Sequence, residues 1–167
     1  MDNPSDTAIK ARPQDERARA QYEHDLYSWA VEQAALLRAG RIAEADAKNI
    51  AEELDDVGNE QYDKLESAIR IILMHLLKWD HQPERRLRSW RSSILVHRRH
   101  VLKVLRKNPG LKPLVGEAVS EAYEVGRIEA AGETELDEDT FPLECPYSYD
   151  ELMQRPVAWP PEESRAR

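Results

Sequence analysis

Arginine and lysine side chains are concentrated in the middle of the chain, where residues 85–107 contain nine of them. Three aromatic side chains, Trp79, His81 and Trp90, accompany this segment. Cationic groups contact phosphates and aromatic rings stack on bases, so the segment is typical of an anion or nucleic-acid site. The nine cations are Arg85, Arg86, Arg88, Arg91, Arg98, Arg99, Lys103, Arg106 and Lys107.

A helical wheel divides these cations into two groups. Apolar residues at Trp90, Ile94 and Val101 share one face, which predicts a helix over 90–107. Most of the cations lie on the opposite face and are free to meet an anionic partner. The candidates for anion binding on that face are Arg88, Arg99, Lys103 and Arg106.

Two other arginines, Arg91 and Arg98, fall inside the apolar arc of the same helix. Burial of an unpaired guanidinium is very costly, so each should meet a carboxylate. The expected structural ion pairs draw on acids of a helix predicted over 44–57, namely Glu52, Glu53, Asp55 and Asp56. The alternative to anion binding is therefore internal pairing of these two arginines and a solvated face for the rest.

Charge is unevenly distributed along the sequence. The formal net charge is −8 for the whole chain, with −8 over residues 22–66, +10 over 67–112 and −10 over 113–167. The blocks can neutralise one another in a compact fold, or the basic block can form one exposed face. A net negative protein argues against non-specific binding of nucleic acid.

Histidines allow two arrangements that a metal could use. His97 and His100 are three apart on the predicted helix, but their directions diverge by about 60° on the wheel. His75 and His81 are the candidate ligands of the second arrangement, which would make a metal-assisted hydrolase. Its carboxylates would come from Glu52, Glu53 and Asp56. We favour the simpler interpretation, in which these histidines are ordinary core or solvated side chains and the protein has no metal or other cofactor.

Catalytic signatures are missing from the sequence. There is no phosphate-binding loop, Gly-rich nucleotide motif, CxxC pair or Ser/His/Asp pattern. The single cysteine, Cys145, lies in the acidic segment FPLECPYSYDE, which would raise the pKa of its thiol and oppose nucleophilic catalysis. We therefore favour a protein that is not an enzyme.

The apolar period is helical throughout the middle of the chain. It predicts an all-α fold, a single bundle-like domain over 21–154 with five main helices and a short C-terminal one. The main helices are expected near 22–39, 44–57, 60–79, 90–107 and 111–131, with Gly58 ending or kinking the second. Ala118, Ala122, Gly126 and Ala130 make a small-residue ridge that lets another helix approach closely.

The two ends lack apolar periodicity. Residues 1–20 are predicted to be a mobile tail, and residues 155–167 a Pro-rich one. The first residues do not resemble a secretory signal, and no stretch approaches the about 20 apolar residues of a membrane span. One cysteine fits a reducing compartment, so we expect a cytoplasmic protein with no membrane partner.

Several strings of this sequence resemble one known family. They are DLYSWAVEQAALLRAGRIAEAD, then NIAEELDDVGNEQYDKLESAIRIILMHLLKWDHQPERRLRSWRSSI, then LKPLVGEAVSEAYEVGR and FPLECPYSYDELM. Together they are similar to the bacterial family catalogued as domain of unknown function twenty-nine, over about Tyr22 to Met153. The resemblance implies an all-helical domain and carries no activity.

Three functions follow as hypotheses. The leading one is a non-enzymatic interaction or regulatory module that binds a protein partner or itself, because charge is strongly segregated along the chain. The alternative is an anion or nucleic-acid binder that uses the basic segment. The third is the metal-assisted hydrolase.

Overall fold

Helices make up almost all of the regular structure of residues 13–159, the part of the chain that the computed structural model describes. No strand occurs in this range, so the all-α prediction is confirmed. Short 3-10 turns connect the helices, the longest being η3 (Pro109–Leu114). The helices are α1 (Pro13–His24), α2 (Leu26–Arg38), α3 (Ala47–His81), α4 (Arg88–Lys107), α5 (Val115–Thr134) and α6 (Tyr149–Gln154).

The chain divides into two compact units, where the sequence had suggested a single domain. The first unit ends at Val57 and the second starts at Gly58, so the division falls within α3. Gly58 was expected to end or kink a helix, yet α3 is helical through it. Glycine in a helix interior costs only about 1 kcal/mol relative to alanine, which the strong helix formers around it offset.

The first unit is organised around Trp29 of α2, which is 3% exposed. The Tyr22 ring meets the Trp29 ring edge-on at 4.8 Å between centroids, and Trp29 Nε1 donates to Asp46 Oδ2 at 3.3 Å. Gln33 is also buried, and its Oε1 accepts a hydrogen bond from the Asp46 backbone N–H at 2.9 Å. Because α1 begins at Pro13, residues 13–20, expected in the N-terminal tail, are helical; residues 1–12 lie outside the described range.

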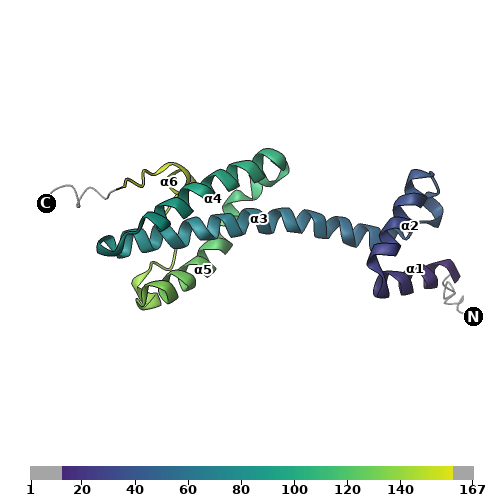
Figure 1. The fold of residues 1–167 in the computed structure, drawn as a ribbon, viewed down its shortest axis with the longest axis horizontal. Coiled ribbons are helices and arrows are strands. Elements are labelled where there is room, and N and C mark those ends of the chain that lie inside the picture. The colour runs from purple at the N-terminus through teal and green to yellow at the C-terminus, as the bar shows by residue number, and fades with distance from the viewer. Residues whose placement is uncertain (1–12, 160–167) are drawn as a thin grey trace, which may run out of the picture. The chain divides into compact units, whose positions relative to one another are not determined.

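The second unit is built on the apolar half of α3. Its core residues Leu65, Ile69, Ile72, Leu73 and Leu76 are all completely buried. Figure 1 shows α4 and α5 on either side of this half of α3. The sequence predicts this role for the segment, because apolar residues there cover nearly the whole helix surface.

Close packing between α3 and α5 depends on the small-residue ridge of α5. Ala118, Ala122, Gly126 and Ala130 are all buried. A Cβ atom added at Gly126 would lie 3.3 Å from the Arg70 backbone oxygen of α3. The glycine therefore allows the two backbones to approach each other.

The C-terminal segment packs on the second unit rather than forming a tail from residue 155. Ser148 and Glu151 form a capping box at the start of α6, the short C-terminal helix. Val157 is 6% exposed, and Arg155 pairs with Asp80 through two N···O contacts of 2.6 Å. Residues 160–167 of the predicted tail lie outside the described range. Across the described residues, no helix combines the length and apolarity needed to cross a membrane.

Candidate functional site

The outer face of α4 carries a row of exposed cations. Trp90, Ile94 and Val101 turn inward and are buried. The helical period then directs the polar positions of the same helix outward. The four predicted anion-binding residues, Arg88, Arg99, Lys103 and Arg106, are all exposed, and we call them the basic face.

Several cations on other elements of the second unit have acidic partners. Buried Lys78 pairs with Glu133, and Arg127 pairs with Glu138. Arg70 likewise pairs with Glu129. These pairs join the elements that surround the core.

The basic face differs from those cations in this respect. Arg99, Lys103 and Arg106 form no ion pair with any described residue, and Arg88 contacts only the ring of Trp159, at 6.0 Å from its centroid. The sequence explains the difference, because residues 85–116 contain ten cations and no aspartate or glutamate. Internal neutralisation is one of the two predicted outcomes for the basic block. Within that block it applies to Arg70 and Lys78 of α3 and not to this face.

Arg98 lies in the interior, where the wheel placed it, and is 7% exposed. Its hydrogen-bond partners within the second unit are backbone carbonyls. Nε donates to Leu152 O at 2.7 Å and Nη1 to Arg155 O at 2.8 Å. The last carbonyls of a helix have no partner within it and carry partial negative charge, so the end of α6 satisfies a guanidinium without an acid. Burial and the nearby Arg155 charge lower the pKa of Arg98.

Arg91 also donates to a backbone carbonyl, from Nε to Val157 O at 2.9 Å. The predicted partners belong to the first unit, where Glu52 contacts Lys48 at 3.8 Å and Glu53 accepts from the Tyr22 hydroxyl at 3.0 Å. The pairing also assumed a separate helix over 44–57, whereas α3 runs on through this segment. Ion pairs from Arg91 or Arg98 to Glu52, Glu53 or Asp56 remain a prediction.

An apolar groove of about 710 Å³ adjoins the C-terminal end of the basic face. Four elements form it: α4, η3, α5 and α6. Two cations, Arg106 and Lys112, are the charged groups of its lining. We call it the basic groove; its lining residues are Leu102, Leu105, Arg106, Pro109, Lys112, Val115 and Tyr149. Burial raises the pKa of Tyr149, with a smaller contribution from Asp150, so its hydroxyl stays protonated near neutral pH.

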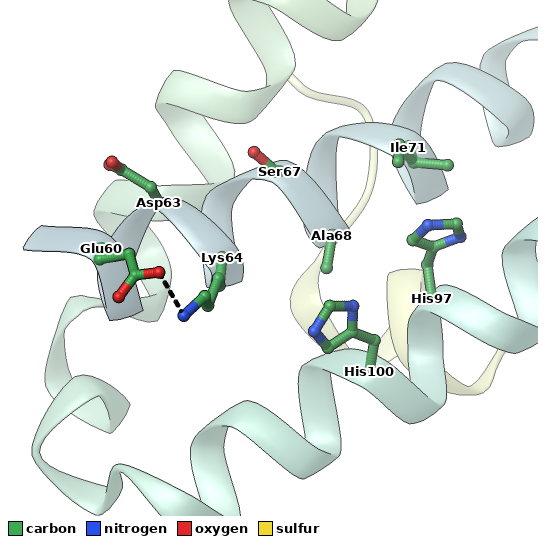
Figure 2. Close-up of a pocket in the computed structure, with 8 residues that line it drawn as sticks. All are labelled: Glu60, Asp63, Lys64, Ser67, Ala68, Ile71, His97 and His100. Carbon is green, nitrogen blue, oxygen red and sulfur yellow. Dashed lines mark ion pairs between the residues drawn. The ribbon is translucent and has the colours of Figure 1, made fainter.

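A second, smaller groove of about 280 Å³ lies between α3 and α4 and contains His97 and His100. Figure 2 shows both imidazoles extending from α4 toward Ala68 and Ile71 of α3. The Glu60 carboxylate in this groove pairs with Lys64 at 2.8 Å rather than with either histidine. His97 Nδ1 donates to its own helix, at the Ser93 carbonyl. The groove thus offers two imidazoles without a carboxylate directed at them.

The other two histidines do not converge on acids either. His81 Nδ1 donates to the Leu77 carbonyl at 2.9 Å, and its ring lies against Phe141. His75 is half-buried, its Nδ1 has no hydrogen-bond partner, and burial, helped by Lys78, lowers its pKa to about 4. In the part of the chain that the structure describes, no group of three or more His, Cys, Asp or Glu side chains has a geometry that could hold a metal. The hydrolase hypothesis gains no support from this geometry.

The Cys145 thiol is directed at a neighbouring backbone carbonyl. Its Sγ donates to Tyr147 O at 3.5 Å, and burial raises the pKa of the thiol. A raised pKa reduces the thiolate fraction, which is the nucleophilic form. The arrangement suits a packed structural thiol.

Sequence reasoning missed several residues that shape these surfaces. Lys112, Val115 and Tyr149 line the basic groove, but they come from three elements that no single helical wheel relates. It also missed the cluster in which Asp80 accepts from Arg155 and, at 2.8 Å, from the Tyr147 hydroxyl. The one available signal was Asp80 itself, an acid directly after the apolar run of α3.

Comparison with known proteins gives a family and nothing closer. No curated protein and no solved structure matches the chain. One family model, described as "Domain of unknown function DUF29", matches residues 21–157, which include most of both units. The match covers well over half of the sequence and agrees with the resemblance of its motifs, so the chain belongs to the DUF29 family.

Proposed function

We propose that this protein is a non-enzymatic interaction module that binds an acidic segment of a partner protein through the basic face of α4. The observation that carries the proposal is the set of exposed cations on this face without an acidic neighbour along residues 85–116. Complementary charge on a partner speeds association and excludes wrong partners. A cytoplasmic setting fits the single cysteine and belongs to the same proposal.

Apolar surface beside the basic face supports a protein partner in particular. Leu102 and Val96 of α4 are 59% and 58% exposed, and Leu102 lines the basic groove. Protein interfaces combine an apolar centre with a polar rim. A helix with leucines on one side and glutamates beside them would satisfy both parts of this surface.

Nucleic acid is the second candidate, favoured by the same row of cations. Two observations rank it lower. Trp79 and Trp90, the rings expected to stack on bases, are only 5% and 8% exposed. The net charge of −8 also repels a polyanion at long range.

Fluorescence anisotropy tests the proposal with a labelled helical peptide of leucines and glutamates, and with a labelled single-stranded DNA of equal length. The wild type should bind the peptide with a Kd of roughly micromolar order and bind the DNA more weakly. The Arg99→Glu, Lys103→Glu double variant should bind the peptide at least about tenfold more weakly. Arg38→Glu, at an exposed arginine of α2, is the matched control and should bind like the wild type.

Two outcomes would contradict the proposal. Equal affinity of the double variant and the wild type for the peptide would remove the basic face from the interaction. Tighter binding of DNA than of peptide would transfer the function to the second candidate.

A further inference from the structure

The basic groove has an apolar lining that runs from the core to the surface. Leu102, Leu105 and Arg106 are spaced three and four positions apart, so they share one side of α4. Leu105 is 8% exposed, whereas Leu102 is 59% exposed. The remaining lining comes from η3, α5 and α6. The groove is therefore a concave site built by four elements, rather than one face of a single helix.

The polar groups of this lining are all able to donate to an anion. Arg106 and Lys112 are exposed and form no ion pair with any residue that the structure describes. The hydroxyl of Tyr149 stays protonated near neutral pH, because burial raises its pKa. No acid lines the groove, and residues 85–116 contain no aspartate or glutamate. An anion from outside the chain would supply the missing counter-charge.

The size and character of the groove suit a small amphipathic molecule. Its volume of about 710 Å³ lies within the range of roughly 300–1,000 Å³ that is typical of small-molecule clefts. Such clefts are mostly apolar and use a few polar groups to orient the ligand. The planar fork of a guanidinium matches a carboxylate, which can accept two parallel hydrogen bonds from it. The complementary ligand has an apolar body and one carboxylate.

We propose that the basic groove binds a free medium-chain fatty acid. The carboxylate lies between Arg106 and Lys112, with the Tyr149 hydroxyl as a further donor, and the alkyl chain covers Leu102 and Leu105. Removal of the alkyl chain from water supplies affinity, and the two cations select the charge of the ligand.

This site is separable from the proposed function. Binding of an acidic protein segment depends on Arg99 and Lys103, which lie outside the lining of the groove. Binding of a fatty acid depends on Arg106 and Lys112 instead. Either activity can therefore be lost while the other is retained.

Isothermal titration calorimetry of the full-length chain with decanoate tests the proposal, below the micelle concentration of decanoate and at about 0.1 M salt. The wild type should bind decanoate saturably, with a Kd of roughly 10–100 µM. Decyltrimethylammonium has the same alkyl chain and the opposite charge, so it should bind at least about tenfold more weakly. Butyrate keeps the carboxylate but loses most of the chain, so it should show no measurable binding.

Variants locate the site. Arg106→Gln, Lys112→Gln should weaken decanoate binding at least about tenfold. The matched control Arg99→Gln, Lys103→Gln also removes two exposed charges, but outside the groove, and should change the Kd less than about twofold. Circular dichroism establishes that each variant is folded.

Methyl NMR of the labelled chain locates the alkyl chain independently of any substitution. Decanoate should shift the methyl signals of Leu102, Leu105 and Val115, which line the groove. Leu143 is 84% exposed and lies outside the lining, so its methyl signals should stay unchanged.

Four results would overturn the proposal. They are a wild type without saturable decanoate binding, equal binding of the cationic analogue, equal loss of binding in the two double variants, and methyl shifts confined to leucines outside the groove. Sedimentation with phosphatidylglycerol vesicles separates a free fatty acid from a lipid surface, because a groove for the free acid predicts no co-sedimentation. Binding of the leucine and glutamate peptide is measured separately, so each of these results leaves the proposed function standing.

Discussion

Arg98 of α4 donates from Nε to the carbonyl oxygen of Leu152 in α6, at 2.7 Å and across 54 positions of sequence. The contact fixes the short last helix against the inner side of α4, the helix whose outer side carries the basic face. Tyr149, which lines the basic groove, begins that same short helix. Arg98, which is buried on the inner side of α4, thus positions Tyr149, a residue of the basic groove that adjoins the outer side of the same helix.

Replacing Arg98 by methionine should destabilise the second unit by about 2–4 kcal/mol, because buried carbonyls at the end of α6 lose their donors. Urea unfolding followed by circular dichroism measures the change. Arg99→Met is the matched control on the next residue, which is exposed, and should change stability by less than about 0.5 kcal/mol. Equal effects of the two substitutions would refute the structural role of the Arg98 carbonyl contacts.

Alanine substitutions at two glycines of α5 should give different results. Gly132 is exposed, and a Cβ there meets nothing within 4 Å, so Gly132→Ala should stabilise the unit by up to about 1 kcal/mol through helix propensity. At Gly126 the added Cβ would crowd the Arg70 backbone oxygen at 3.3 Å, which should cancel that gain or reverse it. Thermal unfolding compares the two variants. A Gly126→Ala protein as stabilised as Gly132→Ala would show that α3 and α5 do not approach this closely.

His75 should make stability depend on pH in the mildly acidic range. Its pKa is about 4 in the folded protein against 6.5 when unfolded, so only the unfolded chain takes up the proton between these values. The free energy of unfolding is therefore highest above pH 6.5 and decreases as the pH drops toward 4. The contribution of His75 to this decrease is at most about 3 kcal/mol.

Urea unfolding at pH 7, 6, 5 and 4 checks this dependence. The variants keep every Asp and Glu, so the contribution of the carboxylates is the same in all of them and the difference between variants isolates the imidazole. His75→Phe should flatten the slope between pH 6.5 and 5, while the exposed control His100→Gln should retain the wild-type slope. An unchanged slope in His75→Phe would mean that the imidazole is not held neutral by burial.

Much of the fold follows from one-dimensional patterns, and the exceptions have identifiable causes. The wheel of α4 correctly separates buried Trp90 and Arg98 from exposed Arg99 and Lys103, because it records direction around a single helix. The same wheel cannot supply the partner of Arg98, since the carbonyls of Leu152 and Arg155 come from a segment far along the chain.

Local signals at Gly58 and Pro13 were misleading for a different reason. Gly58 suggested a helix end, but a single glycine is a small penalty in a helix as long as α3. Residues 1–20, which include Pro13, suggested an irregular tail because they lack apolar periodicity. Proline is nevertheless well suited to the first turn of a helix, and Pro13 begins α1. Over residues 13–159 the expected five main helices and a short sixth agree in number with α1–α6, but the individual helices differ: the predicted helices 44–57 and 60–79 are one helix, α3, and α1 was not predicted.

Most of the basic groove could not be predicted from the sequence. Arg106 was identified as a candidate from its exposed position on one helix. Lys112, Val115 and Tyr149 join it only when η3, α5 and α6 pack against the end of α4. Packing between elements, rather than any motif, creates this surface.

The central claim is that the basic face of α4 receives an acidic protein segment, and NMR mapping tests it most directly. The isotopically labelled chain is titrated with the unlabelled leucine and glutamate peptide. We expect the largest shift changes at Arg99, Leu102 and Lys103, with α5 positions such as Glu124 unchanged. Shift changes confined to α5 or to the first unit, or none at saturating peptide, would contradict the account.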